Sequence, residues 1–258
     1  MMAPGFDARL GRFILAVLVA VLGISAPPFA RPTAGAMARW PQLMLWAWER
    51  PEDLRGLPAG VGVAFLAQTI NVGGTRPPLE LRRQPLRVDR STALVAVTRI
   101  QITPDPARPL ADADATTFAA LIATTRSMPQ VAGLQVDFDA TRSQRPFYRQ
   151  LVAELRRLVG PGMPISVTAL ASWCEGDRWL DTLDVDEAVP MVFRMGPTNE
   201  MFRGLGTTGR WQAAECRGAV GTSLDEPIPL RGDGRRLYVF APRPWTAASI
   251  QAAQLIGR

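Results

Sequence analysis

The sequence predicts an α/β fold, a (β/α)8 TIM-like barrel whose connections need not all be regular. Eight strand-like segments follow residue 40 and alternate with helix-like segments, which is the pattern of a parallel sheet. The chain has 258 residues, a usual size for one barrel of this type. The fourth strand-like segment ends in two acidic residues, Asp137 and Asp139. Chemistry in such barrels lies at the carboxyl ends of the strands.

The strands are expected where short apolar runs are bounded by Gly, Pro or polar residues. The eight expected strands are residues 42–49, 62–69, 93–101, 133–139, 165–173, 188–195, 218–224 and 237–242. Residues 52–57 should form a turn after the first strand. Residues 75–88, between the second and third strands, are compatible with extended structure in place of a helix.

Helices are expected where apolar residues recur every three or four positions. The clearest helix covers residues 144–159, where Phe147, Leu151, Leu155 and Leu158 form an apolar stripe. The sequence Gly-Pro-Gly that follows should end it. The other helical segments are 112–127, 179–183 and 246–256.

Gly204, Gly206 and Gly209 have the G-x-G-x-x-G spacing of a dinucleotide-binding loop. Such a loop must follow a strand and open a helix within a βαβ unit, and this motif does neither clearly. We therefore expect an ordinary loop here.

Residues 1–30 have the composition of an export signal. Arg9 and Arg12 give a positive start, and residues 13–26 form an apolar core that is short for a membrane span. The alternative is an uncleaved anchor, which would be the only contact with a membrane. In both cases the body of the protein is predicted to be periplasmic or secreted. After a linker at 31–39, residues 40–258 should form a single barrel domain.

The two cysteines, Cys174 and Cys216, are expected to form a disulfide, because paired cysteines in an exported protein are usually bridged. Both follow predicted strands, so the bridge would join two loops on one face of the barrel. A catalytic thiol is disfavoured, because the chain has no His to activate it.

The composition removes several classes of chemistry. All 29 basic residues are Arg, and the chain has no Lys and no His. This excludes Schiff-base and pyridoxal phosphate chemistry, Ser-His-Asp triads and ordinary zinc sites. Carboxylate chemistry is favoured instead, with no cofactor and no metal. The net charge is +6, but the Arg residues are scattered, so no nucleic-acid partner is expected. We expect a monomer.

Asp137 and Asp139 are two residues apart on one strand, so they share a face at about 6–7 Å, while Val136 and Phe138 point to a covering layer. Glycoside hydrolysis needs carboxyl groups in such positions. We predict Asp139 as general acid, with a pKa raised by burial and by repulsion from Asp137. Asp137, paired with Arg194, would orient the substrate or stabilise positive charge.

A two-carboxylate mechanism requires a second acid across the mouth of the barrel, and Glu226 is the predicted partner. The other candidates are Asp225, Glu49 and Glu175. The competing interpretation is that the two Asp carboxylates form structural ion pairs. Their partners would then be Arg142, Arg145 or Arg194.

The strand ends also supply side chains suited to a sugar-binding cleft, since indole faces stack on pyranose rings and charged groups bind hydroxyls. The predicted substrate-binding residues are Trp46, Trp48, Glu49, Arg50, Gln68, Arg99, Trp173, Glu175, Met191, Arg194 and Trp245. Each Trp could equally serve in core packing, so the prediction depends on their clustering at strand ends. The expected ligand is a polysaccharide or oligosaccharide.

Several motifs occur in a fixed order between residues 40 and 245. They are Trp46-Ala-Trp48-Glu49-Arg50-Pro-Glu52-Asp53-Leu-Arg55, Val63-Ala-Phe-Leu-Ala-Gln68-Thr69, the acidic fourth strand, Thr168-Ala-Leu-Ala-Ser-Trp173-Cys174 and Asp186-Glu-Ala-Val-Pro-Met-Val-Phe-Arg194-Met-Gly196. Together they resemble a bacterial family of exported proteins with no assigned function. The resemblance implies export and supplies little chemistry.

The fourth strand has a more distant likeness. It resembles that of chitinase-type glycoside hydrolase barrels, Asp-Gly-x-Asp-x-Asp-x-Glu, in which Glu is the general acid. Over residues 132–139, Gly133 and Asp137 match, and Asp139 stands in place of the Glu. The departures are Ala132 and Gln135 for two Asp residues, and Met191-Val-Phe193-Arg194 for Met-x-Tyr-Asp on the sixth strand. The resemblance implies the fold, while the departures argue against the substrate-assisted acetamido mechanism of that group.

Two functions remain open on this basis. The first is an exported carbohydrate-active barrel that hydrolyses an envelope or extracellular polysaccharide by carboxylate acid/base chemistry. The second is a catalytically inactive barrel that binds a glycan or an envelope partner. The paired Asp residues favour the first, and the reduced acidic motif favours the second.

Overall fold

The computed structural model describes residues 37, 40–103, 110–176, 179–195, 199–230 and 234–257. The predicted export segment, 1–30, lies outside the described residues, as does the linker 31–39 except for Met37. By their contacts, residues 31–258 group into one unit. No helix in the described part of the chain is long and apolar enough to cross a membrane.

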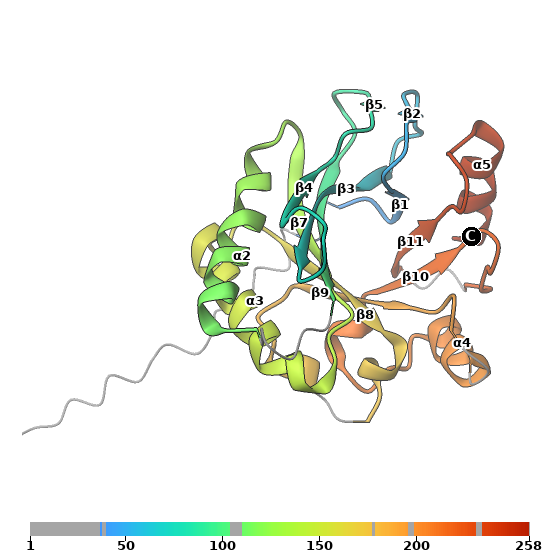
Figure 1. Cartoon of the computed structure of the whole chain (residues 1–258). Coiled ribbons are helices and arrows are strands. Elements are labelled where there is room, and N and C mark those ends of the chain that lie inside the picture. The colour runs from blue at the N-terminus through green and yellow to red at the C-terminus, as the bar shows by residue number, and fades with distance from the viewer. Residues whose placement is uncertain are drawn as a thin grey trace, which may run out of the picture. The chain divides into compact units, whose positions relative to one another are not determined.

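Eight parallel strands form a closed barrel, which confirms the predicted fold (Figure 1). The strands are β1 (Leu43–Ala47), β3 (Val61–Val72), β6 (Leu94–Ile102), β7 (Val131–Asp137), β8 (Ile165–Leu170), β9 (Glu187–Met191), β10 (Ala219–Ser223) and β11 (Arg236–Phe240). The barrel closes because Leu43 of β1 is in register with Leu237 of β11 on one side and Val61 of β3 on the other.

The first two connections of the barrel are extended rather than helical. β2 (Glu52–Leu54) lies in the predicted turn and pairs with β5 (Leu86–Val88), and β4 (Leu79–Leu81) pairs antiparallel with β3. In the second of these connections, the prolines at 77, 78 and 85 explain the absence of a helix, because proline removes a hydrogen-bond donor and blocks the preceding turn.

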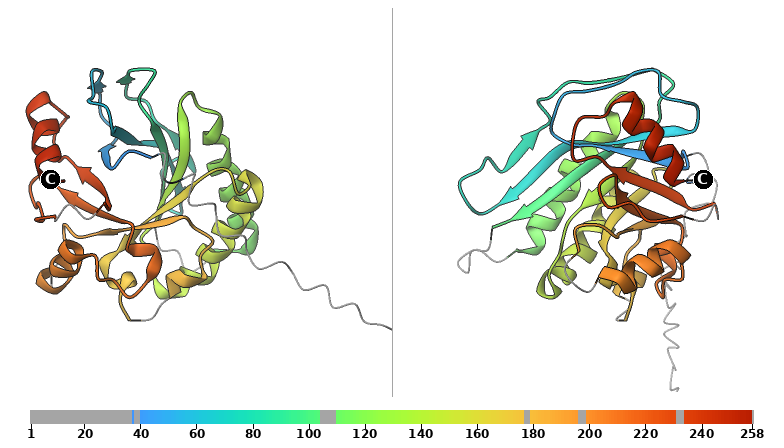
Figure 2. Two further views of the ribbon diagram at one scale, coloured as in Figure 1. Left: turned by 180° about the vertical axis from the view of Figure 1, so that it is seen from behind. Right: turned by 90° about the vertical axis from the view of Figure 1, so that its right-hand side faces the viewer.

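Alpha helices follow β6, β7, β9 and β11, and they lie outside the ring of strands (Figure 2). They are α2 (Asp112–Thr124), α3 (Arg145–Val159), α4 (Asn199–Thr208) and α5 (Ala247–Ile256), with short 3₁₀ helices at Thr125–Ser127, Arg142–Gln144, Ala171–Cys174, Trp179–Thr182 and Ala214–Cys216. The predicted stripe of α3 faces the barrel, where Phe147, Leu151 and Leu155 are buried. Gly160 ends α3 with φ of 75°, a conformation that favours glycine.

Several expected boundaries were wrong. The first strand ends at Ala47, the second continues to Val72, and the fourth ends at Asp137, so that Asp139 lies just beyond it. The fifth strand ends at Leu170 and the sixth at Met191, each earlier than predicted. The segment of Gly204, Gly206 and Gly209, predicted as a loop, instead forms the second half and end of α4. Gly206 serves packing here, since a Cβ atom would lie 2.9 Å from Cγ1 of Val192.

Two apolar clusters stabilise the barrel. One lies between the strands and the helices and contains Val136 and Phe138, as predicted. The other fills the barrel interior around Met44, Trp46 and Tyr238. Trp40 belongs to the inner cluster and closes the amino-terminal end of the barrel. It packs so closely on Gly133 that a Cβ atom there would be 1.9 Å from the indole.

A buried polar network lies inside the barrel below Trp46. Arg236 forms an ion pair with Glu187, and Glu187 also accepts hydrogen bonds from Tyr238 (2.9 Å) and Ser166 (3.2 Å). Arg236 further donates to the carbonyl of Met37 at 2.8 Å. The network therefore fixes the chain that enters the first strand to the last strand of the barrel.

The predicted disulfide is present. Cys174 and Cys216 are bonded, with 5.9 Å between their Cα atoms, and both are buried. The bond joins the 3₁₀ helix after β8 to the one before β10.

We expect the double substitution Cys174→Ala/Cys216→Ala to lower the free energy of unfolding by about 2–4 kcal/mol. The bond closes a loop with a sequence separation of 42, and such a cross-link restricts the unfolded chain. Urea denaturation followed by circular dichroism measures the loss, with reduced wild type as an independent comparison. Alanine avoids placing a hydroxyl in an apolar site. Equal midpoints for the variant and the oxidised wild type would contradict the expectation.

Candidate functional site

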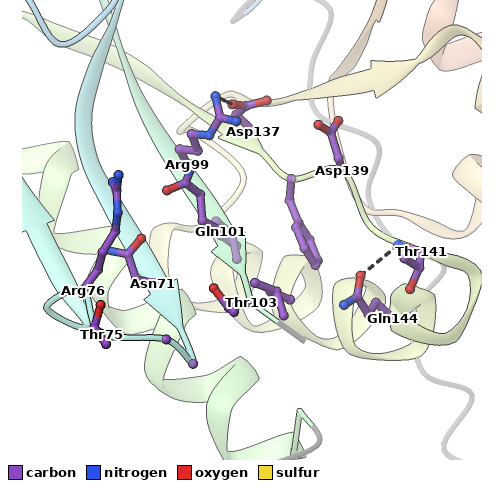
Figure 3. A pocket seen from close by; sticks show the side chains of 15 residues that line it. Asn71, Thr75, Arg76, Arg99, Gln101, Thr103, Asp137, Asp139, Thr141 and Gln144 are labelled. Atoms are coloured by element: carbon purple, nitrogen blue, oxygen red, sulfur yellow. Dashed lines mark hydrogen bonds and ion pairs between the residues drawn. The ribbon is translucent and has the colours of Figure 1, made fainter. Parts of the chain in front are cut away.

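An open cavity of about 720 Å³ lies at the carboxyl ends of β3, β6 and β7 (Figure 3). This is the end of a parallel barrel where functional side chains are expected. Its polar lining side chains are Asn71, Thr75, Arg76, Arg99, Gln101, Thr103, Asp137, Asp139, Thr141 and Gln144. Hydroxyl, amide, guanidinium and carboxyl groups together suit a ligand rich in hydroxyls.

Asp137 is the last residue of β7, and two neighbouring strands hold its carboxylate. Its Oδ1 accepts a hydrogen bond from Thr168 of β8 at 2.8 Å, and its Oδ2 lies 3.6 Å from Nη1 of Arg99 on β6. Burial raises the pKa of Asp137, while Arg99 and the Thr168 hydrogen bond oppose that rise and Asp139 adds to it.

The prediction that Arg194 pairs with Asp137 was wrong. Arg194 lies beyond β9, and its guanidinium is 4.8 Å from the ring centroid of Phe240. Arg99 takes its place because β6 and β7 are adjacent, with Arg99 and Asp137 in register. In the described structure the ion-pair partner of Asp137 is Arg99.

Asp139 lies two residues beyond Asp137 and lines the same cavity. Figure 3 shows it beside Asp137, whose carboxylate the guanidinium of Arg99 reaches. The residue is exposed on its cavity side, yet surrounding protein atoms still desolvate the carboxyl group and raise its pKa, with Arg99 opposing. The predicted direction is therefore matched, although the repulsion between the two acids acts on the pKa of Asp137.

Tyr148 of α3 was not anticipated as a neighbour of the two acids. It is fully buried against Phe138, and its hydroxyl has no hydrogen-bond partner among the described residues. Burial and the charges of Asp137 and Asp139 raise its pKa well above the usual value. The signal in the sequence that could have identified Tyr148 is its position on the buried face of α3.

A second cavity, of about 500 Å³, adjoins the first. The two share Arg76, Arg99 and Gln101 in their linings. Three more of the predicted binding residues, Trp48, Glu49 and Gln68, line this second cavity. Gln68 is oriented by hydrogen bonds to Thr98 and to the carbonyl of Leu121, at 3.1 and 3.0 Å.

Trp46, Trp173 and Trp245 are buried and line neither cavity. Trp46 lies in the barrel interior, where its indole N–H donates to Gln135 at 2.8 Å. The indole N–H of Trp245 donates to the carbonyl of Trp46 at 3.0 Å. Trp173 packs on Trp179 with 4.9 Å between ring centroids. We therefore do not include these three in the proposed site.

The remaining predicted residues lie on other parts of the barrel mouth. Arg50 pairs with Glu52 at 2.6 Å, and Glu175 accepts from the backbone N–H of Gln212 at 3.1 Å. Met191 packs on the inner apolar cluster.

Glu226 and Arg194 also lie apart from the two acids. Glu226, in the loop after β10, accepts from the backbone N–H of Arg194 at 3.0 Å. Among the described residues that line the first cavity, Asp137 and Asp139 are the only acids. The role predicted for Glu226 stays a prediction.

No protein-family profile matches this chain. No curated protein matches it either. The resemblances seen in the sequence thus stay predictions, and the site has to be interpreted from its own geometry. In the described part of the chain, no three His, Cys, Asp or Glu side chains are placed to hold a metal ion.

Proposed function

We propose that this protein is an exported carbohydrate-active barrel, related to glycoside hydrolases, that cleaves a polysaccharide with Asp139 as general acid. The observation that carries the proposal is the difference between the two acids in one open cavity. Asp137 is buried and held by Thr168 and Arg99, whereas Asp139 faces the cavity without a hydrogen bond to any described residue. A TIM-like barrel is compatible with this chemistry, although fold alone does not decide function.

The reaction follows from these positions. Protonated Asp139 donates its proton to the glycosidic oxygen as the bond from that oxygen to the anomeric carbon breaks. Positive charge develops at the sugar, and the carboxylate of Asp137, the other acid that lines the cavity, would stabilise it. Water then adds to the anomeric carbon and gives a proton to the carboxylate of Asp139, which regenerates the acid. The raised pKa of Asp139 favours the protonated form that the first step needs.

The support for export is indirect. Residues 1–30 have the composition of a signal peptide or anchor. The Cys174–Cys216 bond is of the kind that persists in oxidising compartments. A periplasmic or secreted location agrees with a polysaccharide substrate.

The second function is a barrel that binds a glycan without cleaving it. One observation favours it, namely that the predicted second acid, Glu226, does not line the cavity of Asp139. In a two-carboxylate mechanism, Asp137 would then have to be the second carboxylate beside Asp139.

A panel of oligosaccharides, including chitin and peptidoglycan fragments and neutral and acidic polysaccharides, tests the proposal. Binding is measured by calorimetry, and cleavage by reducing-end assay and mass spectrometry. We expect cleavage of at least one member by the wild type. Binding of a member without cleavage would favour the second function. Absence of binding across the panel would contradict both.

A further inference from the structure

Arg99 presents unused hydrogen-bond donors at the junction of the two cavities. Its closest anion, Asp137, is 3.6 Å away, which is too far for a hydrogen bond. None of its five N–H donors bonds a described residue. Asp137 and the ring of Trp48, 6.0 Å from the guanidinium carbon, nevertheless fix its position. With a side chain 36% exposed, Arg99 is oriented but available to a ligand.

Arg76 places a second guanidinium at the same junction. It follows β3 and lines both cavities, together with a third of about 260 Å³ beside them. Its nearest acid is Glu80 at 3.9 Å, and its side chain is 67% exposed. Two guanidinium groups with free donors match the geometry of a carboxylate or sulfate, which guanidinium binds through paired hydrogen bonds.

The charges of the cavity also suit an anionic ligand. Of the two acids in the first cavity, Asp137 already faces Arg99. When Asp139 carries the proton that it donates, its carboxyl group is neutral. The first cavity then holds two guanidinium groups against one carboxylate. The second cavity adds Arg83, Glu49 and Glu80, of which Glu80 already faces Arg76 and Glu49 accepts from the backbone N–H of Arg83. The chain as a whole has a net charge of +6, which raises the rate of encounter with a polyanion.

Asn71 forms part of the wall of the first cavity. It is only 9% exposed and lines the first cavity. Its amide nitrogen donates to the carbonyl of Pro77 at 2.8 Å, but its side-chain oxygen has no partner among the described residues. Buried polar atoms are normally paired, but this oxygen is itself enclosed by protein, so Asn71 shapes the cavity wall and is not a predicted ligand contact.

We propose that the substrate is an acidic polysaccharide whose carboxylate or sulfate group binds Arg76 and Arg99 where the two cavities meet. A sugar on one side of this point contacts Asp139, and the next lies in the second cavity against Trp48. The inference rests on the proposed function and defines the class of its substrate.

Matched pairs of oligosaccharides test this assignment by calorimetry. Uronate oligosaccharides (galacturonate, mannuronate and glucuronate) are compared with their carboxyl-reduced forms, and sulfated oligosaccharides with their desulfated forms. The protein is the full chain with Asp139→Asn, which keeps position 139 uncharged and prevents turnover. We expect the acidic member of at least one pair to bind tenfold or more tightly, and the responding pair identifies the anionic group.

Three arginine variants locate the recognition. Arg76→Gln and Arg99→Gln should each remove most of the preference. Arg90→Gln, an exposed site before β6 at the opposite end of the barrel, should keep it. Because Arg76 is mostly exposed, its variant should fold normally, whatever happens to Arg99→Gln. An unchanged preference in Arg76→Gln, or an equal loss in Arg90→Gln, overturns the assignment.

The two proposals fail in different ways. Equal or tighter binding of the neutral members overturns the acidic substrate and leaves a carbohydrate-active barrel. Absence of binding to every member, acidic and neutral, overturns the acidic substrate and counts against the proposed function as well.

Discussion

Asp139→Asn is expected to lower kcat/KM for polysaccharide cleavage by about 10²–10⁴-fold, the contribution of a positioned general acid. Asparagine has nearly the same shape as aspartate but cannot donate the proton to the leaving oxygen. Binding should change much less than turnover, because Asp139 forms no hydrogen bond in the described structure that holds other groups in place. Initial rates with the substrate found by the panel measure the effect.

Two matched variants define what the loss means. Glu154→Gln, on α3 and paired with Arg157 at 2.8 Å, should retain wild-type rates. Glu226→Gln tests the predicted second acid, and a loss as large as that of Asp139→Asn would establish a two-carboxylate mechanism. Retention of more than about a tenth of wild-type activity in Asp139→Asn would be too small a loss for a general acid.

The same variant separates a catalytic acid from a structural ion pair through its stability. The pKa of Asp139 is raised in the folded protein. A carboxyl with a higher pKa in the folded state binds protons more tightly when folded, so stability is lost as the pH rises through that pKa. Wild type should therefore lose this contribution as the pH rises above about 4, the ordinary pKa of an aspartate carboxyl, whereas Asp139→Asn should not. Urea denaturation across this range would contradict the catalytic interpretation if the variant were the less stable protein at pH 7.

Arg236→Met is expected to lower the free energy of unfolding by about 3–5 kcal/mol, because removing one partner leaves a buried charge uncompensated. Glu187, 3% exposed, would keep only the hydrogen bonds from Tyr238 and Ser166. The substitution also removes the hydrogen bonds from Arg236 to the carbonyls of Met37 and Pro41, at 2.8 and 3.0 Å. Urea denaturation at pH 7 measures the loss.

A double substitution identifies the cause. Glu187→Leu/Arg236→Met should be less destabilised than Arg236→Met alone, because no charge then remains in the interior. Arg157→Met, which breaks the exposed pair with Glu154, should cost less than about 1 kcal/mol. If Arg236→Met cost no more than Arg157→Met, the buried network would not stabilise the barrel as described.

The sequence predicted the barrel because its strongest signals are local. The apolar run of β7, the stripe of α3 and the Gly-Pro-Gly stop after it depend on residues close together in the chain. The same holds for the position of Asp137 and Asp139 at a strand end. The glycines of α4 hid that helix, because their low helix propensity outweighed its apolar residues.

The partners of the site depend instead on strand register, which the local pattern does not contain. Arg99 and Thr168 reach Asp137 because β6 and β8 flank β7 at matching heights. The sequence could not separate the tryptophans of the core from those of a cleft for a related reason. An indole at a strand end serves a core as well as a cleft, and the buried hydrogen bonds of Trp46 and Trp245 show which applies.

The pairing of β1 with β11, which closes the barrel, also sets the order in which the chain can fold during synthesis. Arg236 contacts Met37 and Trp245 contacts Trp46, each across 199 residues, and Arg50 contacts Ala241 across 191. Contacts of such long range form slowly, and β1 cannot find its second neighbour until the end of the chain has emerged. A chain truncated before β11 would leave two strands with open edges, and such edges pair with other chains. Shortened forms should therefore aggregate rather than fold as smaller barrels.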